Sequence, residues 1–175
     1  MKLTNHTDRL SFQHTYQVKD EENLRKIIDG GAISFVNVRH PFDRLISAYL
    51  YLRTENKTFE EVIMQEILEK ITPDQTRGTY RDIVPFYRPY NAYCAFCNIK
   101  YDIVSKMETF EEDKQRALDI LGVENEGERL NTEGGQEIQN LTRHFFKNIS
   151  EEHMAAIVDF HKYDFLMFDY NYNLQ

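Results

Sequence analysis

The stretch Ile33–Tyr49, ISFVNVRHPFDRLISAY, predicts a passage from a β-strand into a helix that decides the fold. Residues Ile33–Val38 form a run of apolar residues, mostly β-branched or aromatic, which is typical of a fully covered strand in a parallel sheet. Pro41 suits the first turn of a helix, because the N–H that proline lacks has no helical partner there. Apolar side chains then recur at helical spacing, so we expect a helix from Phe42 to about Thr54.

Two types of anion-binding side chain follow this predicted strand. Arg39 comes directly after it, at the carboxyl end where open α/β sheets bind their ligands. Ser47 lies in the predicted helix, on a stripe shared with Arg44 and Tyr51. An arginine fork and a hydroxyl at a strand-to-helix turn suit the binding of a phosphate group. The sequence therefore predicts a phosphate site.

The pattern R-x-P-F-x-R-L-x-S-A-Y resembles the 3′-phosphate-binding motif of the Golgi carbohydrate sulfotransferases, in particular the group of the chondroitin, dermatan and HNK-1 sulfotransferases. Those enzymes transfer a sulfuryl group from 3′-phosphoadenosine 5′-phosphosulfate (PAPS) to a hydroxyl of a glycan. The resemblance implies that Arg39 and Ser47, with Arg44 beside them, bind this co-substrate, and that no metal is required. The family usually has an acidic residue after the arginine, where this chain has His40.

Two later blocks are similar to the same family. Tyr93–Asp113 resembles its C-x-P-C…YD…G-K-x-E-T-x-x-x-D block, and His144–Tyr170 resembles its C-terminal segment ending in Y-x-x-D-F-x-x-F-x-Y. Together the matches run from about Ala32 to Tyr170, in the family's order, which makes the signal specific. Alternating strand and helix signals independently predict an α/β domain with a parallel sheet flanked by helices. The resemblance narrows this to the sulfotransferase version of the P-loop nucleotide-binding fold.

Nothing in the chain resembles the family's P-K-V-x-x-T-N-W segment, which binds the 5′-phosphosulfate. We therefore expect residues 1–175 to form one partial domain that lacks the first strand and this loop. A partial gene model, an alternative transcript and a decayed paralogue would each explain the difference. Two functions stay open: a carbohydrate sulfotransferase, or a non-catalytic relative that binds nucleotide or glycan without turnover.

Composition limits the partners and the compartment. The 175 residues have a formal net charge of −8, which disfavours a general nucleic-acid-binding surface. No apolar run reaches the roughly 20 residues of a membrane-spanning helix, so membrane contact is expected only through an N-terminal anchor that is absent here. The resemblance and four N-x-[ST] sequons favour the lumenal side of the Golgi membrane. Any contact with an anionic glycan needs a local basic patch, for which the candidates are Arg39, Arg44, Arg53, Arg81 and Arg88.

Cys94 and Cys97 are the two cysteines of the chain. A C-x-x-C pair occurs in zinc sites, in redox motifs and in short-loop disulfides. No partner pair of zinc ligands is evident, and the residues that follow favour a strand rather than the helix of a redox motif. A structural disulfide is the favoured interpretation, either between these two cysteines or to an upstream cysteine.

The remaining elements follow from capping residues and apolar spacing. Two capping boxes are predicted, one from Thr58 with Glu61 and one from Thr109 with Glu112. The other predicted elements are a helix from Asp20 to about Asp29, a helix from Thr58 to about Ile71, a strand at Asn98–Val104, a helix ending at Gly122, a loop at Glu124–Gln136, a helix capped by Ser150 with Met154, Ile157, Val158 and His161 inward, and an aromatic tail Tyr163–Tyr172 packed on the core.

The segment Pro73–Pro89 is a predicted loop in which aromatic residues alternate with arginines. These aromatics would either stack on adenine or sugar rings, or pin a surface loop to the core. The general base of a sulfotransferase is not identified by the sequence. His14 is a weak candidate, His40 is better placed to bind than to act as a base, and the late histidines His144, His153 and His161 are expected to be structural.

Overall fold

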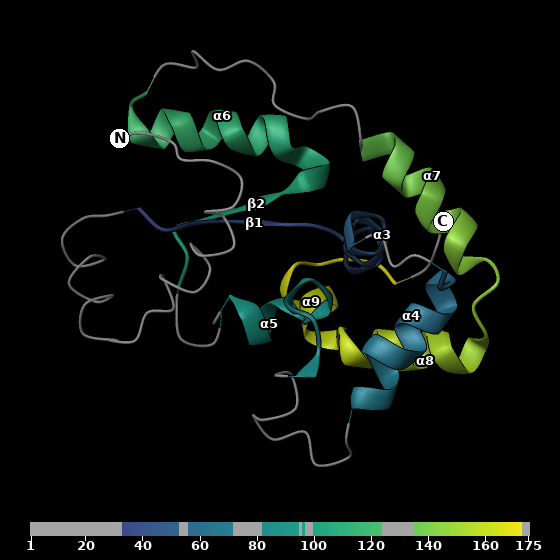
Figure 1. Cartoon of the computed structure of the whole chain (residues 1–175). Coiled ribbons are helices and arrows are strands. Elements are labelled where there is room, and N and C mark those ends of the chain that lie inside the picture. The colour runs from purple at the N-terminus through teal and green to yellow at the C-terminus, as the bar shows by residue number, and fades with distance from the viewer. Residues whose placement is uncertain are drawn as a thin grey trace.

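The computed structural model describes residues 33–52, 56–71, 82–94, 96, 100–123 and 135–172 (Figure 1). The predicted helix from Asp20 to Asp29 lies outside these residues. The elements are, in chain order, β1 (Phe35–Val38), α3 (Pro41–Leu52), α4 (Phe59–Glu66), η1 (Leu68–Lys70), η3 (Pro85–Tyr87), α5 (Tyr90–Tyr93), β2 (Ile103–Lys106), η4 (Met107–Thr109), α6 (Phe110–Leu121), α7 (Gly135–Phe146), α8 (Glu151–Phe160) and α9 (Lys162–Met167).

The described sheet has two strands, β1 and β2, which pair in parallel with Phe35 opposite Ile103 and Val38 opposite Lys106. Helix α6 lies on one side of the sheet, and α5 and α9 lie on the other (Figure 1). The α/β class and the parallel sheet are therefore confirmed. The second strand, however, begins at Ile103 rather than at Asn98, because side-chain bonds between Ser34 and Asp102 form the entrance to the ladder.

Strand β1 is not covered on both faces, contrary to the prediction from its apolar run. Val38 is fully buried, whereas Phe35 is 46% exposed. Val38 packs in a small cluster with Tyr90 and Phe168, on the side of α5 and α9. The side chain of Phe35 points to the opposite face, because successive residues of a strand alternate. Only the end of β1 next to the turn is therefore held firmly by packing.

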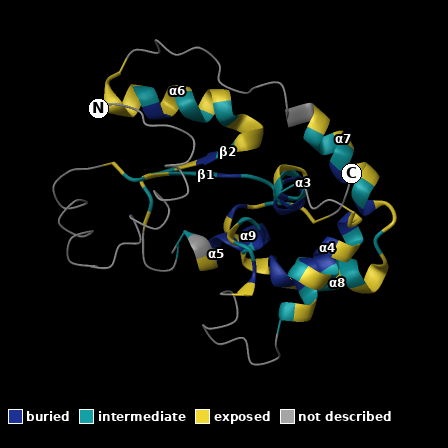
Figure 2. Cartoon of the chain, viewed as in Figure 1, coloured by how far each residue is buried: buried dark blue, intermediate teal, exposed yellow. Residues whose placement is uncertain are grey.

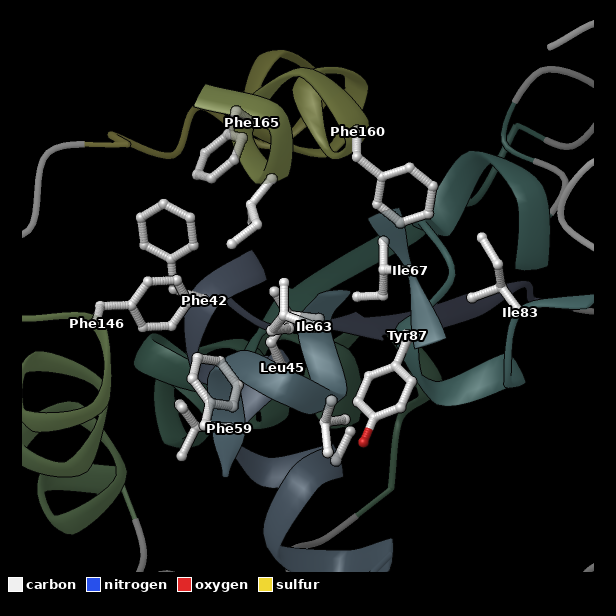
Figure 3. Packing of buried hydrophobic residues seen from close by; sticks show 14 residues of the cluster. Phe42, Leu45, Phe59, Ile63, Ile67, Ile83, Tyr87, Phe146, Phe160 and Phe165 are labelled. Atoms are coloured by element: carbon white, nitrogen blue, oxygen red, sulfur yellow. The ribbon is translucent and has the colours of Figure 1, made fainter. Parts of the chain in front are cut away.

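Helix α3 is the central element of the main core. Figure 2 shows buried residues, in dark blue, on α3 and on the neighbouring helices α4, α8 and α9. Phe42, Leu45 and Ile46 are fully buried, and their helical spacing places them on one face of α3. Figure 3 shows aromatic and aliphatic side chains from α3, α4, α7, α8 and α9 converging around them. The ring of Phe42 lies 4.6 Å from that of Phe146 and 5.3 Å from that of Phe165, between centroids. Truncating a buried phenylalanine of this kind costs about 3–5 kcal/mol of stability.

Capping residues fix several helix ends, although one prediction is wrong. Thr58 and Glu61 form the predicted capping box of α4, but α4 ends at Glu66 and a separate 3₁₀ turn follows. Ser150 accepts the N–H of His153 and caps α8 as predicted. Thr109 caps nothing, because its hydroxyl donates instead to the Asp113 carboxylate, which also accepts the N–H of Lys106.

The C-terminal aromatic segment packs on the core through one face only, which confirms the prediction in outline. Phe165 and Phe168 are buried, whereas Tyr163 is 51% exposed and Leu166 is 76% exposed. Helix α7, which lies outside the predicted elements, covers part of α3. Among the described residues, no helix has both the length and the apolar character that a membrane span requires.

Candidate phosphate-binding site

The carboxyl ends of both strands lie at the same edge of the sheet, as they must in a parallel pair. Arg39 and His40 follow β1 at this edge, and Met107 and Glu108 follow β2. The C-terminal segment reaches the same edge, because the Tyr170 hydroxyl donates to the Glu108 carboxylate at 2.8 Å. Burial, and then the nearby Glu108 carboxylate, raise the pKa of Tyr170, so its phenol stays protonated and serves as the donor.

Arg39 occupies the predicted position at the end of β1 and is half-buried. Its backbone N–H donates to the Tyr90 phenol oxygen at 3.0 Å. Within the part of the chain that the structure describes, no carboxylate or carbonyl bonds to its guanidinium. The guanidinium lies at the edge of the sheet where a ligand of an open α/β sheet is expected.

The His40 side chain is held within the protein. Its Nδ1 accepts the N–H of Phe42 at 3.3 Å, and its Nε2 lies 2.8 Å from the carbonyl oxygen of Asn171. An imidazole with its hydrogen on Nε2 satisfies both contacts. Since both nitrogens are engaged, neither is left to bind a phosphate or to accept a proton from a substrate.

The backbone of the β1–α3 turn is also engaged. The N–H of Arg39 donates to Tyr90, and the N–H of His40 donates to the Glu108 carboxylate at 2.7 Å. Many phosphate sites at strand-to-helix turns use such backbone N–H groups. Here side chains of the protein already occupy them, so a phosphate at this turn depends on the side chain of Arg39.

Arg44 points into the protein, toward α9. Its Nη2 lies 3.1 Å from the Asp164 carboxylate and 3.3 Å from His161 Nδ1, and its Cζ lies 4.1 Å from the centroid of the Tyr90 ring. Only 15% of the side chain is exposed. The Arg44 guanidinium therefore forms an internal ion pair with Asp164, whereas the sequence predicted that it lies beside a bound phosphate.

Asp164 joins three elements through its two oxygens. Oδ1 accepts the N–H of Tyr90 at 2.8 Å, and Oδ2 accepts from Arg44 of α3. His161 beside it is fully buried, and this burial lowers the pKa of His161 to about 4. The histidine is therefore neutral at pH 7, and its burial confirms the expected inward position on the helix. Its Nε2 and the Nε of Arg44 are buried with no hydrogen-bond partner among the described residues.

Ser47 is half-buried, and its hydroxyl has no bonded partner among the described residues. Residues three or four apart share a helix face, so Ser47 lies between Arg44 and Tyr51. Arg44 stacks on Tyr90, and the Tyr51 ring lies 5.5 Å from that of Phe86. The hydroxyl of Ser47 is therefore on the side of α3 that faces the segment from η3 to α5.

The aromatic segment is pinned to the core, as the second of its two interpretations predicts. Tyr87 is fully buried and Tyr90 is 8% exposed, which leaves little ring surface for stacking on a ligand. Arg88 donates from Nε to the carbonyl oxygen of Ile83 at 2.7 Å. The other members of the alternating pattern, Tyr80, Arg77 and Arg81, lie outside the described residues, as does Arg53.

Two further predicted sites are only partly within the described residues. Cys94 forms no disulfide with another described residue, and burial raises the pKa of its thiol to about 11. Cys97 lies outside the described residues, so a disulfide between them stays a prediction. His14, the weak candidate for a base, also lies outside them. No group of three or more potential metal ligands occurs among the residues that the structure describes.

The sequence analysis did not assign Tyr90, Glu108 or Asp164 to the site. Glu108 is the acidic residue of the K-x-E-T pattern and Asp164 is that of the D-F-x-x-F-x-Y pattern, so both carried a usable signal within the two later family blocks. Asp164 also lies close in sequence to Phe160, Phe165 and Phe168. A carboxylate in such surroundings requires a partner, because an unpaired buried charge is very costly. The sequence does not indicate which arginine provides it.

Comparison with known proteins identifies the family of this chain. The sequence model of the sulfotransferase family matches residues 1–171, so the chain belongs to that family. This confirms the resemblance and extends it to the N-terminal residues, which none of the recognised blocks includes.

Several similar proteins are carbohydrate sulfotransferases. Carbohydrate sulfotransferase 11 of Mus musculus is 31% identical over 165 residues, which cover 79% of this chain and 47% of the mouse protein. Carbohydrate sulfotransferase 10 of Homo sapiens is 28% identical, with 78% of this chain and 46% of the human protein covered. Carbohydrate sulfotransferase 9 of Homo sapiens is 26% identical, with 77% and 37% covered. The chain thus spans about half the length of the curated relatives it matches, or less. No solved structure matches it significantly.

Proposed function

We propose that this chain is the donor-binding part of a carbohydrate sulfotransferase, which transfers a sulfuryl group from PAPS to a glycan hydroxyl. The single observation that carries the proposal is the guanidinium of Arg39, which has no bonded partner among the described residues and lies at the carboxyl edge of the sheet, in a member of the sulfotransferase family. That side chain would hold the 3′-phosphate of the donor through charge-assisted hydrogen bonds.

The other two residues of the predicted phosphate site have different roles in this proposal. Ser47 contributes a second hydrogen bond to the phosphate, because its hydroxyl has no partner among the described residues. Arg44 positions α3 through its ion pair with Asp164 and does not bind the phosphate itself. The protein then accelerates transfer by holding donor and acceptor in line and by stabilising charge on the sulfuryl oxygens. The proposal includes no metal, and His14 remains the weak candidate for the base.

The proposed acceptor is a glycan, of the chondroitin or dermatan type or another sugar chain of a proteoglycan or glycoprotein. The names of the relatives support a carbohydrate acceptor in general. Nucleic acid is not a proposed partner, in view of the formal net charge of −8.

A lumenal Golgi location belongs to the same proposal. The sequon asparagines Asn56, Asn140 and Asn148 are exposed, as acceptors of N-glycans must be. The Ser and Thr residues of these sequons also have structural roles, which would explain their presence without glycosylation. Thr58 and Ser150 cap helices, and the Thr142 hydroxyl donates to Asp43. Expression behind a secretory leader, followed by glycosidase treatment, tests the location. A loss of apparent mass is expected, and an unchanged mass would contradict it.

Calorimetric titration with 3′-phosphoadenosine 5′-phosphate (PAP), the desulfated donor product, tests the proposed function. The wild-type chain should bind, and Arg39→Ala should weaken binding roughly 10- to 100-fold, which corresponds to a charge-assisted bond of about 1.5–3 kcal/mol. Arg116→Ala is the control, because this arginine of α6 is 74% exposed and, among the described residues, pairs with Asp113 of its own helix. Normal binding of PAP by a folded Arg39→Ala variant would show that the phosphate site is elsewhere.

A non-catalytic relative that binds nucleotide without turnover is the second candidate. The observation that favours it is the Glu108 carboxylate, which bonds to the turn beside Arg39 and places negative charge near the proposed phosphate. Transfer of labelled sulfate from PAPS to chondroitin distinguishes the two functions. Binding of PAP without transfer would support the second.

A further inference from the structure

We propose that Tyr90 is a positioning residue, whose hydroxyl fixes the backbone of Arg39 so that the guanidinium meets the 3′-phosphate. The inference rests on the proposed function and adds a residue to its site. It concerns an interaction between elements 51 residues apart in the chain.

Tyr90 is itself held on three sides. Its backbone N–H donates to Asp164, the face of its ring lies 4.1 Å from the Arg44 guanidinium, and its edge packs on Phe168 at 5.5 Å between centroids. A side chain with this many contacts has one orientation, so its hydroxyl is a fixed acceptor for the backbone N–H of Arg39.

The hydroxyl is suited to the role chemically as well. Burial is the largest influence on this group and raises the pKa of Tyr90, so the phenol is protonated throughout the neutral range. Its oxygen accepts the N–H of Arg39 without introducing a negative charge beside a phosphate. The Arg39 guanidinium has no bonded partner of its own among the described residues. The hydrogen bond from the Arg39 backbone to Tyr90 is therefore the polar contact that fixes the backbone from which this side chain extends.

The chain provides a matched control, a second buried tyrosine that differs from Tyr90 in the hydrogen bonding of its hydroxyl. Tyr87 lies three residues before Tyr90 and is fully buried, but its phenol has no hydrogen-bond partner among the described residues. Tyr87→Phe and Tyr90→Phe therefore remove the same atom from similar surroundings. Only the second change releases the backbone of Arg39.

The experiment measures the affinities of the wild-type chain and of both variants for PAP and for AMP, which lacks the 3′-phosphate. Tyr90→Phe should weaken PAP binding roughly three- to tenfold, the range for loss of one neutral hydrogen bond, and leave AMP binding unchanged. Tyr87→Phe should change neither. A purely structural role of Tyr90 would instead weaken both nucleotides together.

A double-mutant cycle with Arg39→Ala separates positioning from direct contact. Tyr90→Phe should have no further effect on PAP binding once Arg39 is alanine. Equal PAP affinity of the wild-type and Tyr90→Phe chains, or an undiminished loss in the Arg39→Ala background, would overturn the inference alone. Failure of the wild-type chain to bind PAP would overturn the proposed function and the inference together.

Discussion

The Asp164 carboxylate and the Arg44 guanidinium lie 3.1 Å apart, although 120 residues separate them in the chain. Their side chains are 0% and 15% exposed. The pair joins α9 to α3, and through the N–H of Tyr90 it also fixes α5 (Figure 1). Three helices that border the β1–α3 turn therefore share one buried carboxylate.

Asp164→Ala is expected to destabilise the protein by about 3–5 kcal/mol, because it leaves the Arg44 cation buried without its partner. Urea unfolding followed by circular dichroism measures this. The control is Asp159→Ala, which breaks a 3.0 Å pair with Lys162 whose side chains are 75% and 47% exposed. That loss should be below about 1 kcal/mol. Equal losses in the two variants would contradict a special role of the buried pair.

The stability should fall in mild acid because of His161. Its pKa is about 4 in the folded chain, against an ordinary value of 6.5, and the main cause is burial, opposed by the hydrogen bond to Asp164 and reinforced by the Arg44 charge. Between about pH 6.5 and pH 4, His161 therefore binds a proton in the unfolded chain but not in the folded chain. The contribution is fully present above pH 6.5 and is lost as the pH falls toward 4, on the order of 3 kcal/mol in total.

Unfolding of His161→Gln between pH 7 and pH 4 tests this prediction. The variant should lose part of the pH dependence, with a slope smaller by about one proton across this window. His144→Gln, in an exposed position on α7, should keep the wild-type slope. An unchanged slope in His161→Gln would show that other groups cause the acid sensitivity.

Substitutions of Ser47, within α3, and of Ser150, the residue that caps α8, should affect ligand binding and stability separately. Ser47→Ala should weaken PAP binding severalfold, as expected for one lost hydrogen bond, and leave stability unchanged, because its hydroxyl has no partner among the described residues. Ser150→Ala should leave binding unchanged and cost about 1 kcal/mol, because Ser150 caps α8. Titration calorimetry and urea unfolding of both variants give the four values. Loss of stability in Ser47→Ala with normal binding would contradict the assignment of Ser47 to the phosphate.

Gly122→Ala should destabilise the protein by about 1 kcal/mol, since Gly122 ends α6 with φ of 64°. A Cβ atom at this position would meet nothing within 4 Å, so the cost is conformational and not steric crowding. Gly122→Asn should cost less, because asparagine tolerates the left-handed region better than alanine. Thermal unfolding of both variants checks the order, and equal costs would contradict the conformational explanation.

Local signals in the sequence predicted the elements that depend on neighbouring residues. The strand, the arginine and the proline-started helix of β1–α3 are as expected, and so are the cap at Thr58 and the glycine that ends α6. The errors arise where tertiary contacts decide. The strand β2 starts late because Asp102 bonds to Ser34, and Thr109 fails as a cap because Asp113 takes its hydroxyl.

The same distinction applies to the candidate site. The position of Arg39 was predictable, because the carboxyl end of a strand can be recognised from its local sequence. The partners of Tyr90, Glu108 and Asp164 were not predictable, because these residues lie 51, 68 and 120 residues from the groups that they bond. For the same reason the inward direction of Arg44 was not evident from its position on the helix face.

The long separation between Arg44 and Asp164 also has a consequence for synthesis on the ribosome. A ribosome that adds about 5–20 residues per second needs roughly 6–24 s to make the 120 residues between them. During that interval α3 has emerged while the carboxylate that neutralises its arginine does not yet exist. The ion pair that joins α3 to α9 can therefore form only after the segments that contact α3 from α4, η3 and α7 have been made.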